Sequence, residues 1–297
     1  MRINGDIEIN DNLINQGEAY SRDLVQSHYE NFSVAARILP RQKRQDLYNI
    51  YTFCRLADDF ADNAISIDDA GSKLHNWELS LEAAASGDVN DPFFNALGNT
   101  IRRQNLSLEP FKRLLQAFRL DLIKNRYATR RELSDYTHLS ANPVGTIVLE
   151  LYGYKNSDLF ALSDKICTAL QLANHWQDVA EDYDRGRIYI PLEDMQRHGV
   201  DERTIADKDA NTNFRALVKD EVDFARTMFA EGKDLIFRVN GWLRLQLGLY
   251  FEGGMSALSA IERNNYDVLN NSSKLRKFDK LAVLFRSSLY LFPRKIS

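Results

Sequence analysis

The chain has 297 residues, 44% of them hydrophobic, which is enough to bury the core of one large domain or two small ones. Its 38 Lys and Arg residues against 42 Asp and Glu give a formal net charge of −4, so the composition gives no indication of nucleic-acid binding. The two cysteines, Cys54 and Cys167, lie in apolar helical runs, where small buried side chains are expected rather than a disulfide framework.

Residues 1–18 are polar and lack the apolar segment of a signal peptide. No run of eighteen apolar residues occurs anywhere in the chain, so no membrane-spanning helix is expected. The sequence therefore predicts a cytoplasmic protein, and it leaves peripheral contact with a membrane open.

Helical periodicity runs through most of the chain, with proline and glycine only as punctuation and without the alternation typical of strands. We expect a flexible N-terminal arm over residues 1–17 and a single all-α domain of packed helices over residues 18–297. Helices are predicted for residues 18–39, 41–64, 68–85, 92–104, 110–125, 130–138, 146–152, 158–182, 213–237, 242–262 and 273–292. Residues 140–145 interrupt this pattern, and residues 184–191 are expected to form a loop.

An acidic row lies in the helix predicted for residues 41–64. At about 100° of rotation per residue, one helix face carries five residues: Tyr51, Arg55, Asp58, Asp59 and Asp62. Three carboxylates within roughly 6 Å of helix rise repel one another unless a positive charge lies between them. A solvated surface would explain such a row, but its neighbours are apolar and aromatic, which indicates a buried helix.

A second row lies in the helix predicted for residues 158–182. Gln171, Asn174, Asp178 and Asp182 stand on successive turns of one face. Oxygen ligands without a thiol or imidazole in register suit a hard cation such as Mg²⁺, which keeps several waters and shares phosphate oxygens. Two facing helices with such rows could hold Mg²⁺ around a diphosphate and assist its departure.

Other metal sites fit the sequence less well. In a calcium loop that starts at Asp182, the fifth position would be Gly186, which has no oxygen donor, and the sixth would be Arg187, where glycine is needed. The sequence has no Glu-x-x-His pair, which argues against a di-iron carboxylate bundle. Hydrogen-bonding or surface roles are expected for the five histidines, which show no ligand spacing: His28, His75, His138, His175 and His198.

The two rows together resemble the aspartate motifs of the squalene/phytoene synthase family, the head-to-head prenyl transferases. Residues 58–62, DDFAD, are similar to the first motif, Asn174, Asp178 and Asp182 match the second, and residues 186–191 match the loop after it. The resemblance extends from about residue 21 to residue 269. Within the family, residues 28–32, 140–145 and 174–178 look most like the bacterial hydroxysqualene synthase branch of hopanoid biosynthesis.

This resemblance implies an isoprenoid-synthase-type helical bundle around a central cavity. The implied substrate is presqualene diphosphate, bound through Mg²⁺ that is held by six residues: Asp58, Asp59, Asp62, Asn174, Asp178 and Asp182. Arg55 matches an arginine that contacts the diphosphate, and Tyr51 and Tyr136 match tyrosines near the reacting carbons. The implied catalytic set is Tyr51, Arg55, Asp58, Tyr136 and Asp178. The other implied substrate contacts, with Phe32 and Val144 at tunnel-lining positions, are His28, Phe32, Val144, Gln171 and Arg187.

The implied reaction is ionisation to a cyclopropylcarbinyl cation, rearrangement and capture by water as hydroxysqualene, without a nicotinamide. In squalene synthase a hydride from NADPH takes the place of water. The alternatives within the family are a presqualene diphosphate, squalene or phytoene synthase. An alternative of another class is a catalytically silent binding or assembly subunit, against which the two intact rows argue.

Gln177 departs from the family pattern, because phytoene and presqualene diphosphate synthases usually have an arginine there. This change fits an enzyme that does not carry out the two-substrate condensation, and Arg187 or Lys274 could replace the lost diphosphate contact. The basic runs at residues 41–44 and 274–280 are either solvated surface or contacts for diphosphate or anionic lipid. Oligomeric state, number of metal ions and use of NADPH stay open.

Three glycines and one aromatic residue have two interpretations each. Gly145, Gly253 and Gly254 either leave room for an isoprenoid tail or allow close helix packing. Trp176 either supports a carbocation through its ring face or packs in the core.

Overall fold

The computed structural model describes residues 11–27, 39–271 and 276–291. Within these ranges the regular elements are helices and no strand forms, apart from an isolated parallel bridge between Arg126 and Ile188. The all-α prediction is therefore confirmed. None of the helices in these ranges combines the length and apolar character needed to cross a membrane.

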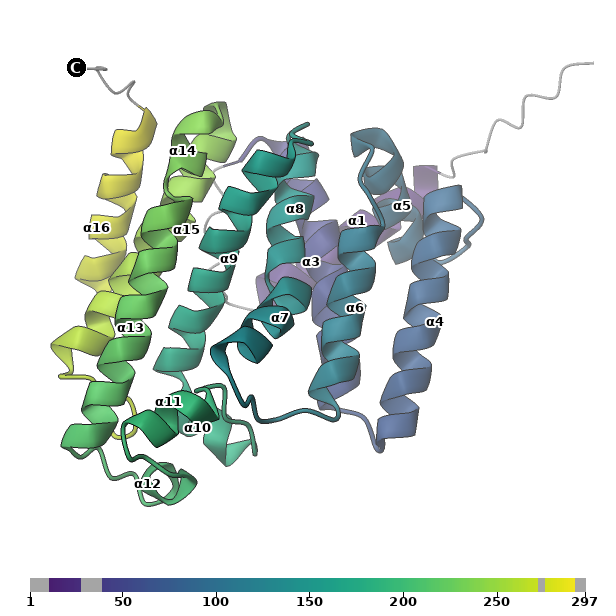
Figure 1. Cartoon of the computed structure of the whole chain (residues 1–297). Coiled ribbons are helices and arrows are strands. Elements are labelled where there is room, and N and C mark those ends of the chain that lie inside the picture. Colours follow the sequence, from purple (N-terminus) through teal and green to yellow (C-terminus); the bar gives the residue numbers. More distant parts are fainter. Residues whose placement is uncertain (1–10, 28–38, 272–275, 292–297) are drawn as a thin grey trace, which may run out of the picture. The chain divides into compact units, whose positions relative to one another are not determined.

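The chain divides into two compact units (Figure 1). The first comprises residues 1–122 and 147–154, and the second comprises residues 123–146 and 155–297. Helix α8, Asn142–Leu151, contributes its first half to the second unit and its second half to the first. The organisation of residues 18–297 as a single domain stays a prediction.

The first unit is built around α3. Its complete helices are α1 (Asp11–Ser27), α3 (Arg41–Asp62), α4 (Ile67–Ser86), α5 (Pro92–Gln104) and α6 (Glu109–Asp121). Helix α3 begins directly after Pro40 and packs against α1, α4, α5 and α6. Its inner face is fully buried at Leu47, Phe53 and Ala57, so the opposite face is left for polar side chains.

Helix α1 begins at Asp11, so the expected flexible arm over residues 1–17 is wrong for its last seven residues. Ile14, Gly17 and Val25 lie on one face of α1 and are buried. A Cβ atom on Gly17 would lie 2.0 Å from the carbonyl oxygen of Pro92, the first residue of α5. Gly17 is therefore a point of close contact between two helices and not the end of an arm.

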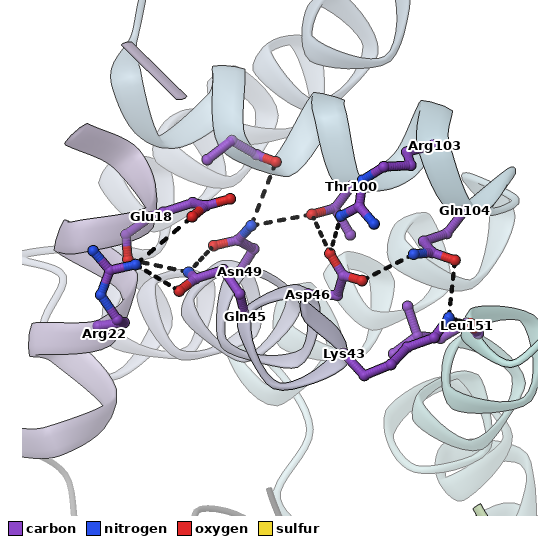
Figure 2. A network of polar contacts seen from close by, with 11 residues as sticks. Glu18, Arg22, Lys43, Gln45, Asp46, Asn49, Thr100, Arg103, Gln104 and Leu151 are labelled. Atoms are coloured by element: carbon purple, nitrogen blue, oxygen red, sulfur yellow. Dashed lines mark hydrogen bonds and ion pairs between the residues drawn. The ribbon is translucent and has the colours of Figure 1, made fainter. Parts of the chain in front are cut away.

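A buried polar network ties the first unit together (Figure 2). Asp46 is fully buried on α3, and its carboxylate accepts hydrogen bonds from Arg103, from Gln104 at 3.0 Å and from Thr100 at 3.2 Å, all on α5. Further along α3, Asn49 donates to Thr100 at 3.1 Å. Because unsatisfied buried polar groups are costly, the network fixes the register of α3 on α5.

The same network reaches α1 and the end of α8 (Figure 2). Gln45 of α3 donates to the Glu18 carbonyl at 3.1 Å and accepts from Arg22 at 2.8 Å. Lys43 donates to the carbonyl of Leu151, the last residue of α8, and burial lowers the pKa of its amine. A cation at a helix C-terminus complements the partial negative charge of the exposed carbonyls.

The second unit consists of longer helices with short ones between them. They are α7 (Arg130–Ser140), α9 (Ser157–Gln177), α10 (Val179–Asp184), α11 (Leu192–Arg197), α12 (Glu202–Ala206), α13 (Thr212–Gly232), α14 (Asp234–Arg238), α15 (Gly241–Arg263), α16 (Lys277–Ser288) and the 3₁₀ helix η1 (Leu289–Leu291). Helix α9 packs against α13 and α15, and α16 packs against α15. Phe214, Phe229 and Leu258 are fully buried within this unit.

Several element boundaries differ from the sequence-based expectation. Helices α11 and α12 were not predicted, because six and five residues are too few to show a helical period. Helix α8 begins at Asn142 and not at residue 146, so only Ala141 separates it from α7. The predicted continuous helix over residues 158–182 is interrupted at Asp178, between α9 and α10.

Candidate active site

The first acidic row lies on the part-exposed face of α3. A terminal nitrogen of Arg55 donates to Asp59 Oδ1 at 2.7 Å, and the other lies 3.8 Å from Asp58 Oδ2. The side chains of Arg55, Asp58 and Asp59 are 30%, 41% and 30% exposed, and Asp62 is exposed. The positive charge expected between the carboxylates is therefore Arg55, and the row is accessible on a helix whose other face is buried.

An aromatic cluster fixes the position of α3. Trp77 of α4 stacks on Phe53 with ring centroids 5.8 Å apart and meets Phe60 edge to face at 5.1 Å. Its indole nitrogen donates to the Phe53 carbonyl at 3.3 Å. Because Phe53 and Phe60 lie within the stretch of α3 that carries the acidic row, this cluster holds the row in one orientation within its unit.

The second row keeps its common face despite the interruption at Asp178. The amide of Asp178 still donates to the Asn174 carbonyl at 3.0 Å, and the amide of Asp182 donates to the Asp178 carbonyl at 2.7 Å. Asn174 is exposed, Asp178 is half-buried and the Asp182 side chain is 16% exposed. From Asn174 to Asp182, the row therefore runs from the surface into the protein.

His175 accompanies the buried end of this row, a position that its lack of ligand spacing did not predict. Its Nδ1 lies 3.8 Å from Asp182 Oδ2, and its ring stacks on Tyr189 with centroids 3.6 Å apart. Burial lowers the pKa of His175, although Asp182 acts in the opposite direction. The imidazole is therefore kept neutral beside a carboxylate of the row.

Arg187 lies close to the second row, and its implied contact with substrate stays a prediction. It lines a cavity of about 10 Å³ together with Asp182, His175 and Tyr189, and its charge contributes to the lowered pKa of His175. A cavity of this volume accommodates about one water molecule. Because Val179, Ile188 and Ile190 complete its lining, it is a small, largely apolar cavity at the end of the row, too small for an isoprenoid tail.

Tyr136 belongs to a stack of tyrosines that continues to His175. Its ring centroid lies 5.2 Å from that of Tyr127 and 5.9 Å from that of Tyr189. Tyr136 and Tyr127 are buried, and Tyr189 forms the link to His175. The second row is thus bordered by electron-rich ring faces.

The junction of α7 and α8 packs on α9 through small residues. A Cβ atom on Gly145 would lie 2.2 Å from Ser163 Oγ, and one on Gly254 would lie 2.3 Å from the Phe229 ring. These two glycines therefore serve close packing, whereas Gly253 faces open space.

Gln171 of the second row is held by a hydrogen bond from α7. Ser140 donates to the Gln171 amide oxygen at 2.9 Å.

The other implied residues have different surroundings. Val144 is half-buried, and Trp176 is 1% exposed among the buried residues of α9, which favours core packing. Burial raises the pKa of the thiols of Cys54 and Cys167 to about 12, and neither forms a disulfide. His28, Phe32 and Lys274 lie outside the described residues.

The donor set of the two rows suits a hard cation. The first row offers carboxylate oxygens, and the second offers carboxylate and amide oxygens, the ligands that Mg²⁺ prefers. Within the described ranges, however, no group of three or more His, Cys, Asp or Glu side chains converges closely enough to hold a metal ion. Either row could thus contribute one or two ligands, with water and phosphate oxygens as the remainder, which is the usual arrangement for Mg²⁺.

Comparisons with known proteins agree with these features. The crystal structure of squalene synthase HpnC from Alicyclobacillus acidocaldarius is 40% identical, with a TM-score of 0.81 over 85% of this chain and 95% of that one. The crystal structure of a dehydrosqualene synthase in complex with ligand is 29% identical, with a TM-score of 0.85 over 94% and 97%. These matches show a fold of the squalene synthase type.

The sequence relatives point to the same family. A 15-cis-phytoene synthase from Synechocystis sp. is 30% identical over 281 residues, which cover 90% of this chain and 83% of that protein. The family model described as Squalene/phytoene synthase matches residues 25–279. Since this match spans most of the sequence and includes both acidic rows, the chain belongs to the squalene/phytoene synthase family.

Proposed function

We propose that the chain is a Mg²⁺-dependent enzyme that converts presqualene diphosphate to hydroxysqualene. The observation that carries this proposal is the pair of oxygen-donor rows, of which the first contains the ion pair of Arg55 with Asp59. The squalene branch of the family is supported by the 40% identity with squalene synthase HpnC, against 30% with a phytoene synthase. The assignment to hydroxysqualene formation is supported by Gln177, which stands where the two-substrate enzymes usually have an arginine.

In the proposed site, both rows act on one diphosphate. Bound Mg²⁺ would neutralise the negative charge that develops on the departing diphosphate. Its ligands would come from Asp58, Asp59 and Asp62 on one row and from Asn174, Asp178 and Asp182 on the other. Arg55 would add a fixed positive charge on the diphosphate oxygens, because its guanidinium already lies among the carboxylates of the first row, beside Asp58 and Asp59.

The proposed reaction begins when the C–O bond to the diphosphate breaks and the electron pair leaves with the oxygen. The resulting cyclopropylcarbinyl cation rearranges by shifts of ring C–C bonds. A water oxygen then forms the new C–O bond and releases a proton to solvent or to the diphosphate, so that no redox partner is consumed. The ring faces of Tyr51 and Tyr136 would support the cation, by up to about 2 kcal/mol each where water is excluded.

A neutral His175 is consistent with this chemistry. An imidazolium beside Asp182 would compete with a metal ion for the carboxylate, and burial lowers the pKa of His175 away from that state. The contact of His175 with Asp182 and Tyr189 would then orient the carboxylate without cancelling its charge.

Phytoene synthase activity is the second candidate, because curated relatives with that name are 28–30% identical along most of the chain. It would join two geranylgeranyl diphosphate molecules and therefore requires two diphosphates in one site. A catalytically silent assembly subunit is the third candidate, and the two intact rows argue against it.

A product analysis separates these candidates. The purified chain is incubated with Mg²⁺ and either presqualene, farnesyl or geranylgeranyl diphosphate, with and without NADPH, and the products are identified by mass spectrometry. Hydroxysqualene from presqualene diphosphate without NADPH supports the proposal. Squalene that forms only with NADPH, or phytoene from geranylgeranyl diphosphate, would overturn it, and no turnover of any of the three would favour the silent subunit.

A further inference from the structure

Helix α16 turns its apolar side away from the protein. The residues of α16 that pack inward include Val283, which is 9% exposed, and Ser287, which is fully buried. On the outward side, three large apolar residues of α16 and the first residue of η1 are 62%, 46%, 68% and 53% exposed, respectively: Leu281, Leu284, Phe285 and Leu289. We refer to these four residues as the α16 stripe. A surface helix of a soluble protein normally has the opposite arrangement.

The spacing of the stripe makes it a continuous surface. Its members stand at positions i, i+3, i+4 and i+8, so they lie on one face over about two turns of helix. Single exposed leucines are common, but contiguous apolar patches on a protein surface mark sites of interaction. In the second unit, α16 packs against α15 (Figure 1).

Contacts with α15 and α14 hold α16 in place along its length. Near its start, Asp279 accepts from Arg263 of α15 at 3.0 Å. Beyond its end, Tyr290 of η1 donates to Glu252 of α15 at 2.8 Å, and its ring meets Phe237 of α14 at 5.6 Å. The stripe is therefore presented by a helix that is supported at both ends.

The charges around the stripe are mainly positive. Among residues 276–291, the described charged side chains are three basic ones, Arg276, Lys280 and Arg286, and one acidic one, Asp279, whereas the whole chain has a net charge of −4. Lys280 is exposed beside the stripe, and so is Arg286, which lies 3.8 Å from Glu252 of α15 but keeps 59% of its side chain exposed, while Asp279, the acidic residue of α16, is engaged by Arg263 of α15. An apolar face bordered by cations matches an interface that has an apolar interior and anionic head groups.

We propose that the α16 stripe docks on the surface of a phospholipid bilayer that contains anionic lipids. The twelve residues of α16 span roughly 18 Å, so the helix would lie in the plane of the interface, with the stripe in the acyl boundary and Lys280 and Arg286 at the head groups. This inference does not depend on the proposed catalytic function.

A second copy of this chain fits the stripe less well than a bilayer. In a two-fold contact through the stripe, the same surface of each copy meets the other, so the cations of both copies would be brought together. Lys280 of one copy would approach Lys280 or Arg286 of its partner, with Asp279 already engaged by Arg263. Anionic head groups instead provide opposite charges.

Co-sedimentation with lipid vesicles tests this proposal. The full chain is mixed with vesicles of phosphatidylcholine containing about one-third phosphatidylglycerol, or of phosphatidylcholine alone, and the bound fraction is measured at low and high salt. We expect binding to the anionic vesicles that weakens with salt and is much lower on the neutral vesicles. The double variant Leu281→Ser/Phe285→Ser should bind the anionic vesicles at least roughly tenfold more weakly, because its apolar face is interrupted.

The matched control is Leu79→Ser, which changes a leucine of α4 that is 49% exposed. It should bind vesicles like the wild-type chain, and circular dichroism should show the same helical content for all variants. Equal binding by the wild-type chain and the double variant, or no binding by the wild-type chain, would overturn the proposal. A wild-type dimer that becomes monomeric in the double variant, without vesicle binding, would assign the stripe to a second copy.

Discussion

Arg55 and Asp59 form an ion pair of 2.7 Å one turn apart on α3, with Asp58 3.8 Å from the same guanidinium. The acidic row of α3 thus contains its own counter-charge. This contact lies on the part-exposed face of a helix whose other face is fixed by the Trp77 cluster. A diphosphate with its cations could exchange partners with this pair without any rearrangement of the core.

Replacement of Arg55 with Ala should lower kcat/KM by about 100- to 1,000-fold, because a fixed donor to the developing negative charge is lost. The fold should persist, since the Arg55 side chain is 30% exposed. Lys73→Ala is the matched control, because Lys73 forms a 2.7 Å pair with Asp69 in the same i,i+4 geometry on α4. Steady-state kinetics that show equal losses for the two variants would contradict the role of Arg55.

Asp178→Asn should reduce Mg²⁺-dependent release of diphosphate to near background, because the variant loses a charged ligand of the proposed metal site. Asp184→Asn is the control, since Asp184 is exposed at the end of α10 and lies outside the row. Diphosphate release is measured by a coupled phosphate assay, and folding by circular dichroism. If Asp178→Asn retains more than about a tenth of wild-type activity, Asp178 does not have the proposed role in diphosphate release.

Asp46→Ala should destabilise the first unit by about 2–4 kcal/mol, because Thr100, Gln104 and Arg103 lose their buried acceptor (Figure 2). Partial exposure of Arg103 limits the loss. The exposed pair of Lys112 with Glu82 provides the comparison, and Lys112→Gln should cost less than about 1 kcal/mol. Urea unfolding measures both, and similar midpoints for the two variants would contradict a structural role of the network.

Glu221→Gln tests a buried carboxyl group in the second unit. Glu221 is 1% exposed and accepts from Arg130 at 3.1 Å. Burial raises the pKa of Glu221 above its usual 4.5, although Arg130 acts in the opposite direction. Between pH 4.5 and the raised pKa, Glu221 is protonated in the folded chain but ionised in the unfolded chain. The contribution of Glu221 to the free energy of unfolding is therefore lost as pH rises through the folded pKa.

Glutamine does not titrate, so the variant should gain stability relative to the wild type as pH rises. The Tm of the variant minus the Tm of the wild type should therefore be more positive at about pH 8 than at about pH 5. Thermal unfolding at the two pH values measures this difference. If this Tm difference is independent of pH, or becomes more negative as pH rises, the Arg130 contact outweighs burial.

Local signals in the sequence were sufficient for much of the fold. Helix α5 has the predicted bounds because Asp91 caps it, with its side chain accepting from the Phe94 amide at 2.9 Å, and Pro92 opens it. The start of α3 at Arg41 follows from Pro40, which stands directly before the helix, although no side chain caps it. The position of both acidic rows on helices also followed from spacing alone.

Other features depend on tertiary packing, which a single sequence does not reveal. Gly17 seemed to end a flexible arm, but it allows α1 to approach the first residue of α5. His175 lacks ligand spacing, yet tertiary structure stacks it on Tyr189 beside Asp182. The period of α16 shows that the helix is amphipathic, but only its contacts with α15 show that the apolar side faces outward.

A crystal structure with Mn²⁺ and a non-hydrolysable prenyl diphosphate analogue would test most directly whether the two rows act on one diphosphate. The account predicts anomalous peaks roughly 2.0–2.2 Å from carboxylate oxygens of both Asp58 and Asp178, with the metal ions bridged by the same diphosphate. A diphosphate held by one row alone, or metal ions bound away from both, would contradict it.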